Sequence, residues 1–93
     1  MAKRKKTYRE LEIIVKGFSN HRRIQIMELL HKEPELSVDE ISEKFSVNFR
    51  TISDHIRKLT TAGLVIKRSD GNMVRHKLTP NGKSILKFLR ILE

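Results

Sequence analysis

The 93-residue sequence contains no cysteine and no tryptophan, and its few aromatic residues are four phenylalanines and one tyrosine. Without cysteine, the chain cannot form disulfides, thiolate metal sites or a cysteine nucleophile. No apolar run approaches the roughly 20 residues that a membrane-spanning helix needs, and the basic start lacks the apolar segment of a signal peptide. We therefore expect a soluble, cytoplasmic protein with no membrane partner.

Acidic residues are scarce in both flanks of the chain, whose formal net charge is +9. Residues 1–23 carry eight lysines and arginines against two acids, and residues 46–92 carry ten against two. Residues 24–45 reverse the balance, with two against six. Segregation of charge on this scale favours a polyanionic partner, nucleic acid before membrane, and hence a nucleoid-associated location.

The length supports one modest hydrophobic core, so we expect a single domain over residues 7–93. A basic, flexible arm over residues 1–6, with the sequence KRKK at 3–6, precedes this domain. The arm either keeps the chain soluble or follows a groove of DNA, where it would add affinity that salt removes.

Two helices are expected before Pro34. Apolar residues from Tyr8 to Phe18 recur at spacings of three and four, which is the helical period, and Gly17 favours a stop near that end. A second apolar-periodic segment follows, with Ser19 or Asn20 as its N-cap.

Residues 37–62 have the pattern of a helix-turn-helix. Ser37 and Glu40 are spaced as a capping box, which marks the start of the first helix. Asn48 can cap the second helix, and Gly63 suits its left-handed end. Two short helices separated by about three residues form this motif.

A β-hairpin and a last helix complete the pattern. β-branched and apolar residues over 64–78 flank the turn sequence DGN. Thr79 as a cap and Pro80 at the first helical position begin a helix over about 80–92. The expected fold is mainly α with a small β-hairpin, a winged helix-turn-helix in the order helix, helix, short strand, helix-turn-helix, hairpin, helix.

This ordered set resembles the winged helix-turn-helix transcriptional regulators of the ArsR type. The resemblance runs from Asn20 to Leu78 and rests on HRRIQIMELL, LSVDEIS, TISDHIRKLTTAGLV and the hairpin. LTPNGKSIL, at 78–86, is similar to the segment after the wing in the MarR type. The resemblance implies a sequence-specific DNA-binding homodimer, usually a repressor, whose second helix of the motif enters the major groove while the hairpin wing contacts the backbone or minor groove.

Helical geometry places Arg50 and Arg57 on the outward face of the second helix of the motif, opposite the apolar face. Arginine is the side chain best shaped to bind guanine O6 and N7 together, so these two are the candidates for reading bases. The wing cations suit phosphate contacts, which position the protein without specifying sequence. The expected DNA-binding residues are Asn48, Phe49, Arg50, Thr51, Ser53, Asp54, Arg57, Lys58, Lys67, Arg68, Arg75 and Lys77. The resemblance assigns Asn48, Thr51 and His55 to capping or phosphate contacts.

Two of these residues have open roles. Asp54 lies within helical reach of Arg50 and Arg57, so it either orients both arginines or accepts a hydrogen bond from cytosine N4. Phe49 lies at the border of the apolar face, so it either joins the core or meets a thymine methyl group.

No catalytic, metal or cofactor site is expected. The metal-binding Cys-x-Cys of many ArsR-type proteins corresponds here to Ser37 and Asp39, and the last helix has no histidine for the family's second metal site. The histidines form no i, i+4 pair of the kind a zinc site needs. A phosphate loop and a nucleophile elbow are also missing.

The first and last helices carry more apolar surface than one small core requires, which favours burial against a symmetry mate. The expected interface residues are Leu11, Ile14, Phe18, Ile85, Phe88, Leu89 and Leu92. An alternative function is a winged-helix module that binds protein or RNA without sequence-specific DNA recognition. The sequence names neither an operator nor an effector ligand.

Overall fold

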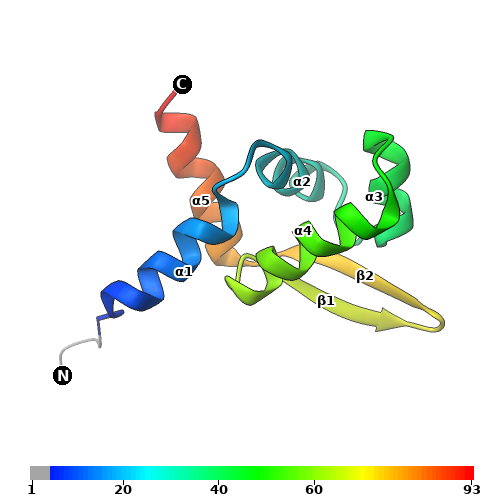
Figure 1. Cartoon of the computed structure of the whole chain (residues 1–93), viewed down its shortest axis with the longest axis horizontal. Coiled ribbons are helices and arrows are strands. Elements are labelled where there is room, and N and C mark those ends of the chain that lie inside the picture. The colour runs from blue at the N-terminus through cyan, green and yellow to red at the C-terminus, as the bar shows by residue number, and fades with distance from the viewer. Residues whose placement is uncertain (1–4) are drawn as a thin grey trace.

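The computed structural model describes residues 5–93, so most of the arm expected at residues 1–6 lies outside it. Residues 5–93 form five helices and one two-stranded antiparallel sheet, which confirms the predicted winged helix-turn-helix fold. In chain order the elements are α1 (Tyr8–Phe18), α2 (His21–Lys32), α3 (Val38–Phe45), α4 (Phe49–Thr61), β1 (Val65–Asp70), β2 (Met73–Leu78) and α5 (Pro80–Ile91) (Figure 1).

Side-chain caps fix where the helices begin, as the sequence predicted. Ser37 and Glu40 form a reciprocal capping box at α3, and the side chain of Asn48 accepts from the amide of Thr51 at α4. Of the two candidates at α2, Asn20 is the cap, since its side chain accepts from the amides of Arg22 and Arg23. Each cap pairs amide groups that would otherwise lack partners.

The stop expected near Gly17 is confirmed, since α1 ends at Phe18, but Gly17 itself is a helical residue with a packing role. The helix α1 continues through Gly17 to Phe18, and Gly17 is buried. A Cβ atom at this position would overlap the side chain of Ala62, which follows α4. Glycine is therefore required here because α1 and α4 approach each other closely, rather than to end the helix.

The hairpin pairs in register from Val65 with Leu78 to Asp70 with Met73. Gly71, at the turn, has a φ of 65°, the left-handed conformation that a tight hairpin turn uses. Leu36, between α2 and α3, forms an isolated antiparallel bridge with His76. This bridge is the short strand expected before the helix-turn-helix, and it ties the base of the wing to that motif.

One core joins these elements. Ile26, Met27 and Leu30 of α2 are buried together with Ile41 of α3. Further buried apolar side chains come from α1, α4, the wing base and α5, and these are Phe18, Ile52, Ile56, Leu59, Leu64, Val65, Leu78 and Leu86. The core therefore fixes the outward face of α4 relative to the wing.

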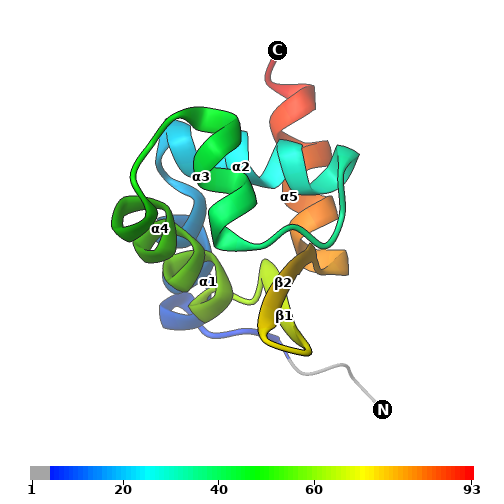
Figure 2. The ribbon, with the colours of Figure 1, turned by 90° about the vertical axis from the view of Figure 1, so that its right-hand side faces the viewer.

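The wing and the first and last helices lie at opposite sides of the molecule. Figure 1 shows α1 and the C-terminal part of α5 projecting from the side opposite the hairpin tip. In Figure 2 the hairpin tip and α3 face the viewer, and α1 and α5 lie behind them. Within residues 5–93, no helix has the length and apolar character to cross a membrane.

Candidate nucleic-acid interface

The helix α4 presents a polar face to solvent because its apolar face is fixed in the core. Ile52, Ile56 and Leu59 are buried. Arg50, Thr51, Arg57 and Lys58 are exposed, whereas Ser53 and Asp54 are half-buried. Together with Asn48 at the cap, the predicted polar residues of this helix therefore share one accessible surface.

Asp54 binds the two basic residues that follow it rather than the two arginines expected. Its Oδ1 atom accepts from Arg57, and its Oδ2 atom lies 3.7 Å from the Lys58 ammonium. Among the described residues, Arg50 has no ion-pair partner. Cα–Cβ bonds in a helix tilt toward its N-terminus, so Arg57 and Lys58 lean back toward Asp54 while Arg50 leans away from it.

The hydrogen bond from Arg57 lowers the pKa of Asp54 below its usual range, and the charges of Arg57 and Lys58 act in the same direction. Burial opposes this shift. Asp54 is therefore ionised at neutral pH, and it fixes the guanidinium of Arg57 on the outward face. The prediction that it orients both arginines was wrong for Arg50.

The four wing cations divide between the two faces of the hairpin. Residues directly opposite each other in an antiparallel pair share a face, so Lys67 lies with its partner His76, and Arg68 lies with its partner Arg75. Lys67 and His76 line a groove between the wing, α3 and α4. Lys77 is exposed on the same face as Arg68 and Arg75.

Arg68 and Arg75 are bound by protein carboxylates rather than left free. The Nε atom of Arg68 donates to Glu35 over 2.7 Å, and that of Arg75 donates to Asp70 over 2.9 Å. Arg75 also donates through Nη1 to the carbonyl of Glu35 at 3.0 Å and lies 3.4 Å from Glu40. Two arginines directly opposite would repel each other, and these carboxylates offset that repulsion.

The same network shifts the ionisation of its members. The hydrogen bond from Arg75 lowers the pKa of Asp70, and the charges of Arg68 and Arg75 lower it further. The pKa of Arg75 is raised in turn, first by the hydrogen bond to Asp70. These interactions hold the stem of the wing against the linker between α2 and α3.

Sequence reasoning missed several residues that position this surface. Glu35 has a φ of 67°, unusual for a residue other than glycine, and it contacts both wing arginines. His76 is 4% exposed, and its Nδ1 atom donates to the carbonyl of Leu36 over 3.0 Å. The sequence did hint at the ion pairs of Glu35 and Glu40, because the acidic block at residues 24–45 lies between two basic segments.

A buried arginine joins α2 to α4. Arg23 is 8% exposed, and its Nη1 atom lies 3.3 Å from Nδ1 of His55. Burial lowers the pKa of His55, and the positive charges of Arg23 and Lys58 lower it further. His55 is therefore neutral at pH 7 and accepts a hydrogen bond from Arg23 on the inner side of the predicted interface.

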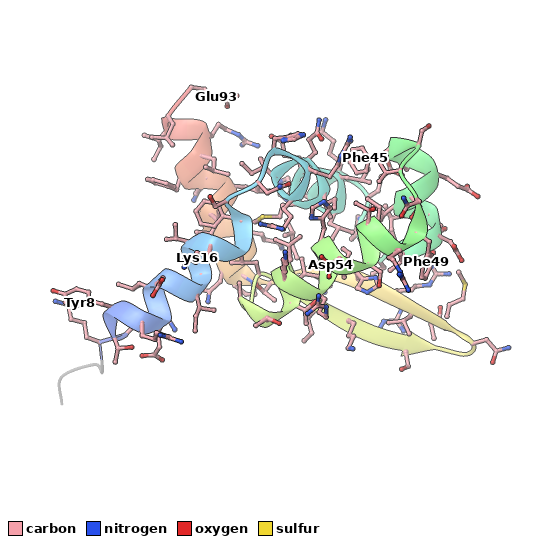
Figure 3. All side chains as sticks on the ribbon, in the orientation of Figure 1. Tyr8, Lys16, Phe45, Phe49, Asp54 and Glu93 are labelled. Carbon is pink, nitrogen blue, oxygen red and sulfur yellow. The ribbon has the colours of Figure 1, made fainter. Side chains whose placement is uncertain are left out.

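Phe49 does not join the core, so the first of its two predicted roles is ruled out. Its side chain is 53% exposed, and the apolar residues that pack around the core include its neighbours Phe45 and Val47 but not Phe49. Figure 3 shows Phe49 at the end of α4 that meets α3, with Asp54 further along the same helix.

The faces of α1 and α5 that the described chain leaves uncovered are apolar. Leu11 is 44% exposed, Phe88 49% and Leu92 67%. Ile14, Ile85 and Leu89 are half-buried against the core. Phe18, in contrast, is only 9% exposed, so it packs within its own chain and offers almost no surface to a second copy.

No group of three or more histidine, aspartate or glutamate side chains that could hold a metal ion is present within residues 5–93. Ser37, one of the two residues expected to correspond to the Cys-x-Cys of ArsR-type metal sensors, is buried and caps α3. The local geometry of Ser37 thus serves helix initiation.

A family model described as an HTH domain matches residues 22–72 of the chain. The putative arsenical resistance operon repressor ArsR of Halobacterium salinarum is 34% identical over 74 residues, which are 78% of this chain. The chain belongs to the ArsR family of winged helix-turn-helix transcriptional regulators. The chain spans only 57% of the length of that ArsR relative.

Solved structures of other regulators share the fold. The transcriptional regulator HlyU from Vibrio vulnificus is 32% identical, with a TM-score of 0.73 over 89% of this chain and 86% of its own. The homodimeric winged helix-turn-helix DNA-binding domain of a possible ArsR-family regulator from Mycobacterium bovis has a TM-score of 0.84 over 99% of this chain and 89% of its own. Its sequence is 23% identical, so this likeness concerns the fold alone.

Proposed function

We propose that this ArsR-family chain is a transcriptional repressor that binds a pseudo-palindromic operator in double-stranded DNA as a homodimer. The observation that carries the proposal is the outward face of α4, where Arg50 and Arg57 are exposed above the buried residues Ile52 and Ile56. A helix with this amphipathic arrangement fits the major groove, in which arginine binds guanine through two hydrogen bonds.

The polar residues of the interface divide by task. Arg50 and Arg57 read base edges, with Arg57 held by Asp54. Asn48, Thr51, Ser53 and Lys58 surround them and contact phosphates or the edges of neighbouring bases. Lys67 and Lys77 of the wing bind phosphates from opposite faces of the hairpin, while Arg68 and Arg75 hold the wing in place through Glu35, Asp70 and Glu40.

Two copies of the chain pair through α1 and α5. The helix α1 and the C-terminal part of α5 lie on the side opposite the wing tip (Figure 1), so pairing there leaves both copies of α4 accessible. The interface consists of Leu11, Ile14, Ile85, Phe88, Leu89 and Leu92. A two-fold dimer of this kind addresses two half-sites about 34 to 36 Å apart.

The repressor name of the Halobacterium salinarum relative supports this activity. The exposed apolar residues of α1 and α5 support the assembly. The net charge of +9 supports attraction to a polyanion.

The test compares Arg50→Ala with Lys67→Ala on a duplex selected for binding and on a random duplex. Arg50→Ala should lose mainly affinity for the selected duplex, by about 1 to 3 kcal/mol, because it removes a base contact. Lys67→Ala should weaken binding to both duplexes, because it removes a phosphate contact. Equal, negligible losses for both variants would contradict the proposal, and tight capture of RNA or protein without any DNA motif would favour the interaction module instead.

A further inference from the structure

Phe49 is a large apolar side chain left exposed on a charged surface. It is the first residue of α4 and 53% exposed. Neighbouring apolar residues of this region, Val38, Phe45 and Val47, pack against the core instead. An exposed aromatic ring beside arginines offers an apolar contact to a ligand that binds this surface.

The ring forms a boundary between two hollows. One hollow is lined by Phe49 together with the outward residues of α4, including Arg50 and Arg57. The other lies between α4 and the wing and is lined by Phe49 together with Lys67 and the half-exposed apolar residues Met73 and Val74. Phe49 is thus part of both the base-reading face of α4 and the groove beside the wing.

The position and chemistry of Phe49 select one ligand group. The N-terminal residues of a recognition helix are those that contact base edges in the major groove. Of the four bases, thymine alone presents an apolar methyl group there, and apolar side chains recognise it. The surrounding cations, Arg50, Arg57 and Lys67, match a polyanion that carries such a group and do not match an apolar ligand.

We infer that Phe49 determines specificity by contacting the 5-methyl group of a thymine in each half-site. This inference rests on the proposed function, since it assigns a base to the same interface. Phe49 supplies the apolar contact that Arg50 and Arg57 cannot make, and it favours a T·A pair where its ring meets the base edge.

The test replaces thymine by uracil, which differs only by the lost methyl group, one position at a time in the selected duplex. For the wild-type chain, affinity should fall about three- to five-fold at one or two positions of each half-site, since burying one such carbon group is worth about 0.8 kcal/mol. Phe49→Ala should bind thymine and uracil duplexes equally at those positions. Phe49→Leu, which keeps an apolar side chain, should retain part of the difference.

Ile66→Ala is the matched control, because Ile66 is 56% exposed and lines neither hollow. It should keep the full difference between thymine and uracil. The unfolding midpoint of Phe49→Ala should equal that of the wild type, because the ring is exposed.

Two results overturn the inference while leaving the proposed function intact. One is a wild-type chain that prefers the selected duplex but is indifferent to uracil at every position. The other is a Phe49→Ala variant that retains the wild-type loss on uracil, which would place the effect in the shape of the DNA. A chain with no preference for any duplex overturns the proposed function and this inference together.

Discussion

At the scale of single residues, the least expected member of the interface is an acid. Asp54 carries a negative charge on the face proposed to meet DNA, and it binds Arg57 and Lys58. The Asp54 carboxylate would repel DNA phosphates, but its ion pair also holds the Arg57 side chain in one position. We propose that this arrangement restrains indiscriminate phosphate binding and directs Arg57 toward a base edge.

Replacing Asp54 by alanine should therefore raise affinity for random duplex while lowering the preference for the selected one. The ratio of the two affinities should fall about two- to five-fold, because exposed ion pairs of this spacing are worth up to about 1 kcal/mol. Titrations of both duplexes followed by fluorescence anisotropy measure the ratio.

Glu43→Ala is the control for charge alone, since it removes an exposed acid from α3. It should leave the ratio unchanged. Equal effects of Asp54→Ala and Glu43→Ala would show that Asp54 acts only through net charge.

His76 makes the stability of the chain depend on pH. Burial lowers the pKa of His76, and its hydrogen bond to the Leu36 carbonyl opposes the shift only in part. The unfolded chain takes up a proton near the ordinary histidine pKa of about 6.5, whereas the folded chain resists it. Stability is thus fully present above that pKa and is lost as pH falls through it toward the folded pKa.

The free energy of unfolding in urea should accordingly decline from pH 7.5 to pH 5.5. His76→Asn keeps a donor near the Leu36 carbonyl but does not titrate, so it should be less stable at pH 7.5 and show a flatter decline. His55, whose pKa is also lowered by burial, accounts for the decline that remains. An unchanged pH dependence in His76→Asn would rule out this role.

At the scale of elements, local sequence signals were sufficient for the helices and the hairpin. Ser37, Asn48 and Thr79 cap their helices as predicted, because capping depends on residues within one turn. The signals failed where distant elements meet. Gly17 lies against Ala62, which follows α4. Glu35 and Glu40, which bind the wing arginines, lie in another part of the chain.

For the candidate site as well, the sequence predicted what depends on one helix and missed what depends on specific side-chain contacts. Helical periodicity placed Arg50, Arg57 and Asp54 on one face, because it requires only the helix itself. It did not reveal that Asp54 selects Lys58 over Arg50, which depends on the direction in which side chains lean. It also did not reveal which wing cations share a face, because that depends on the register of the hairpin.

Arg75 and Lys77 provide a direct test of the division within the wing. Arg75→Ala should lower the free energy of unfolding by about 1 kcal/mol, because it removes hydrogen bonds to three parts of the chain. Lys77→Ala should change stability by less than about 0.5 kcal/mol. In DNA binding, Lys77→Ala should reduce the dependence of log affinity on log salt concentration by about one.

A loss of stability in Lys77→Ala would contradict this division. So would an Arg75→Ala variant that keeps its stability but shows the same reduction in salt dependence. Arg75 would then be the phosphate contact. Chemical denaturation and binding at four salt concentrations distinguish the two assignments.

At the scale of the whole molecule, we propose that DNA binding and dimerisation occupy opposite sides. Phe88, near the C-terminal end of α5, is 49% exposed. Phe88→Asp should convert a dimer into a monomer at micromolar concentration, because it places a charge in an apolar interface. Size-exclusion chromatography with light scattering measures the mass.

Ile66→Asp introduces the same charge at an apolar residue of the wing that is 56% exposed, and it should remain dimeric. A monomeric wild-type chain, or a Phe88→Asp variant that stays dimeric, would show that α5 does not form the interface.

A two-fold dimer that reads bases through α4 must prefer a DNA site with two-fold symmetry. Selection of bound duplexes from a random pool, followed by sequencing, tests it most directly. The account predicts an enriched palindromic motif whose half-sites are centred about 10 base pairs apart. Sequences that remain random after selection, despite measurable binding, would contradict it.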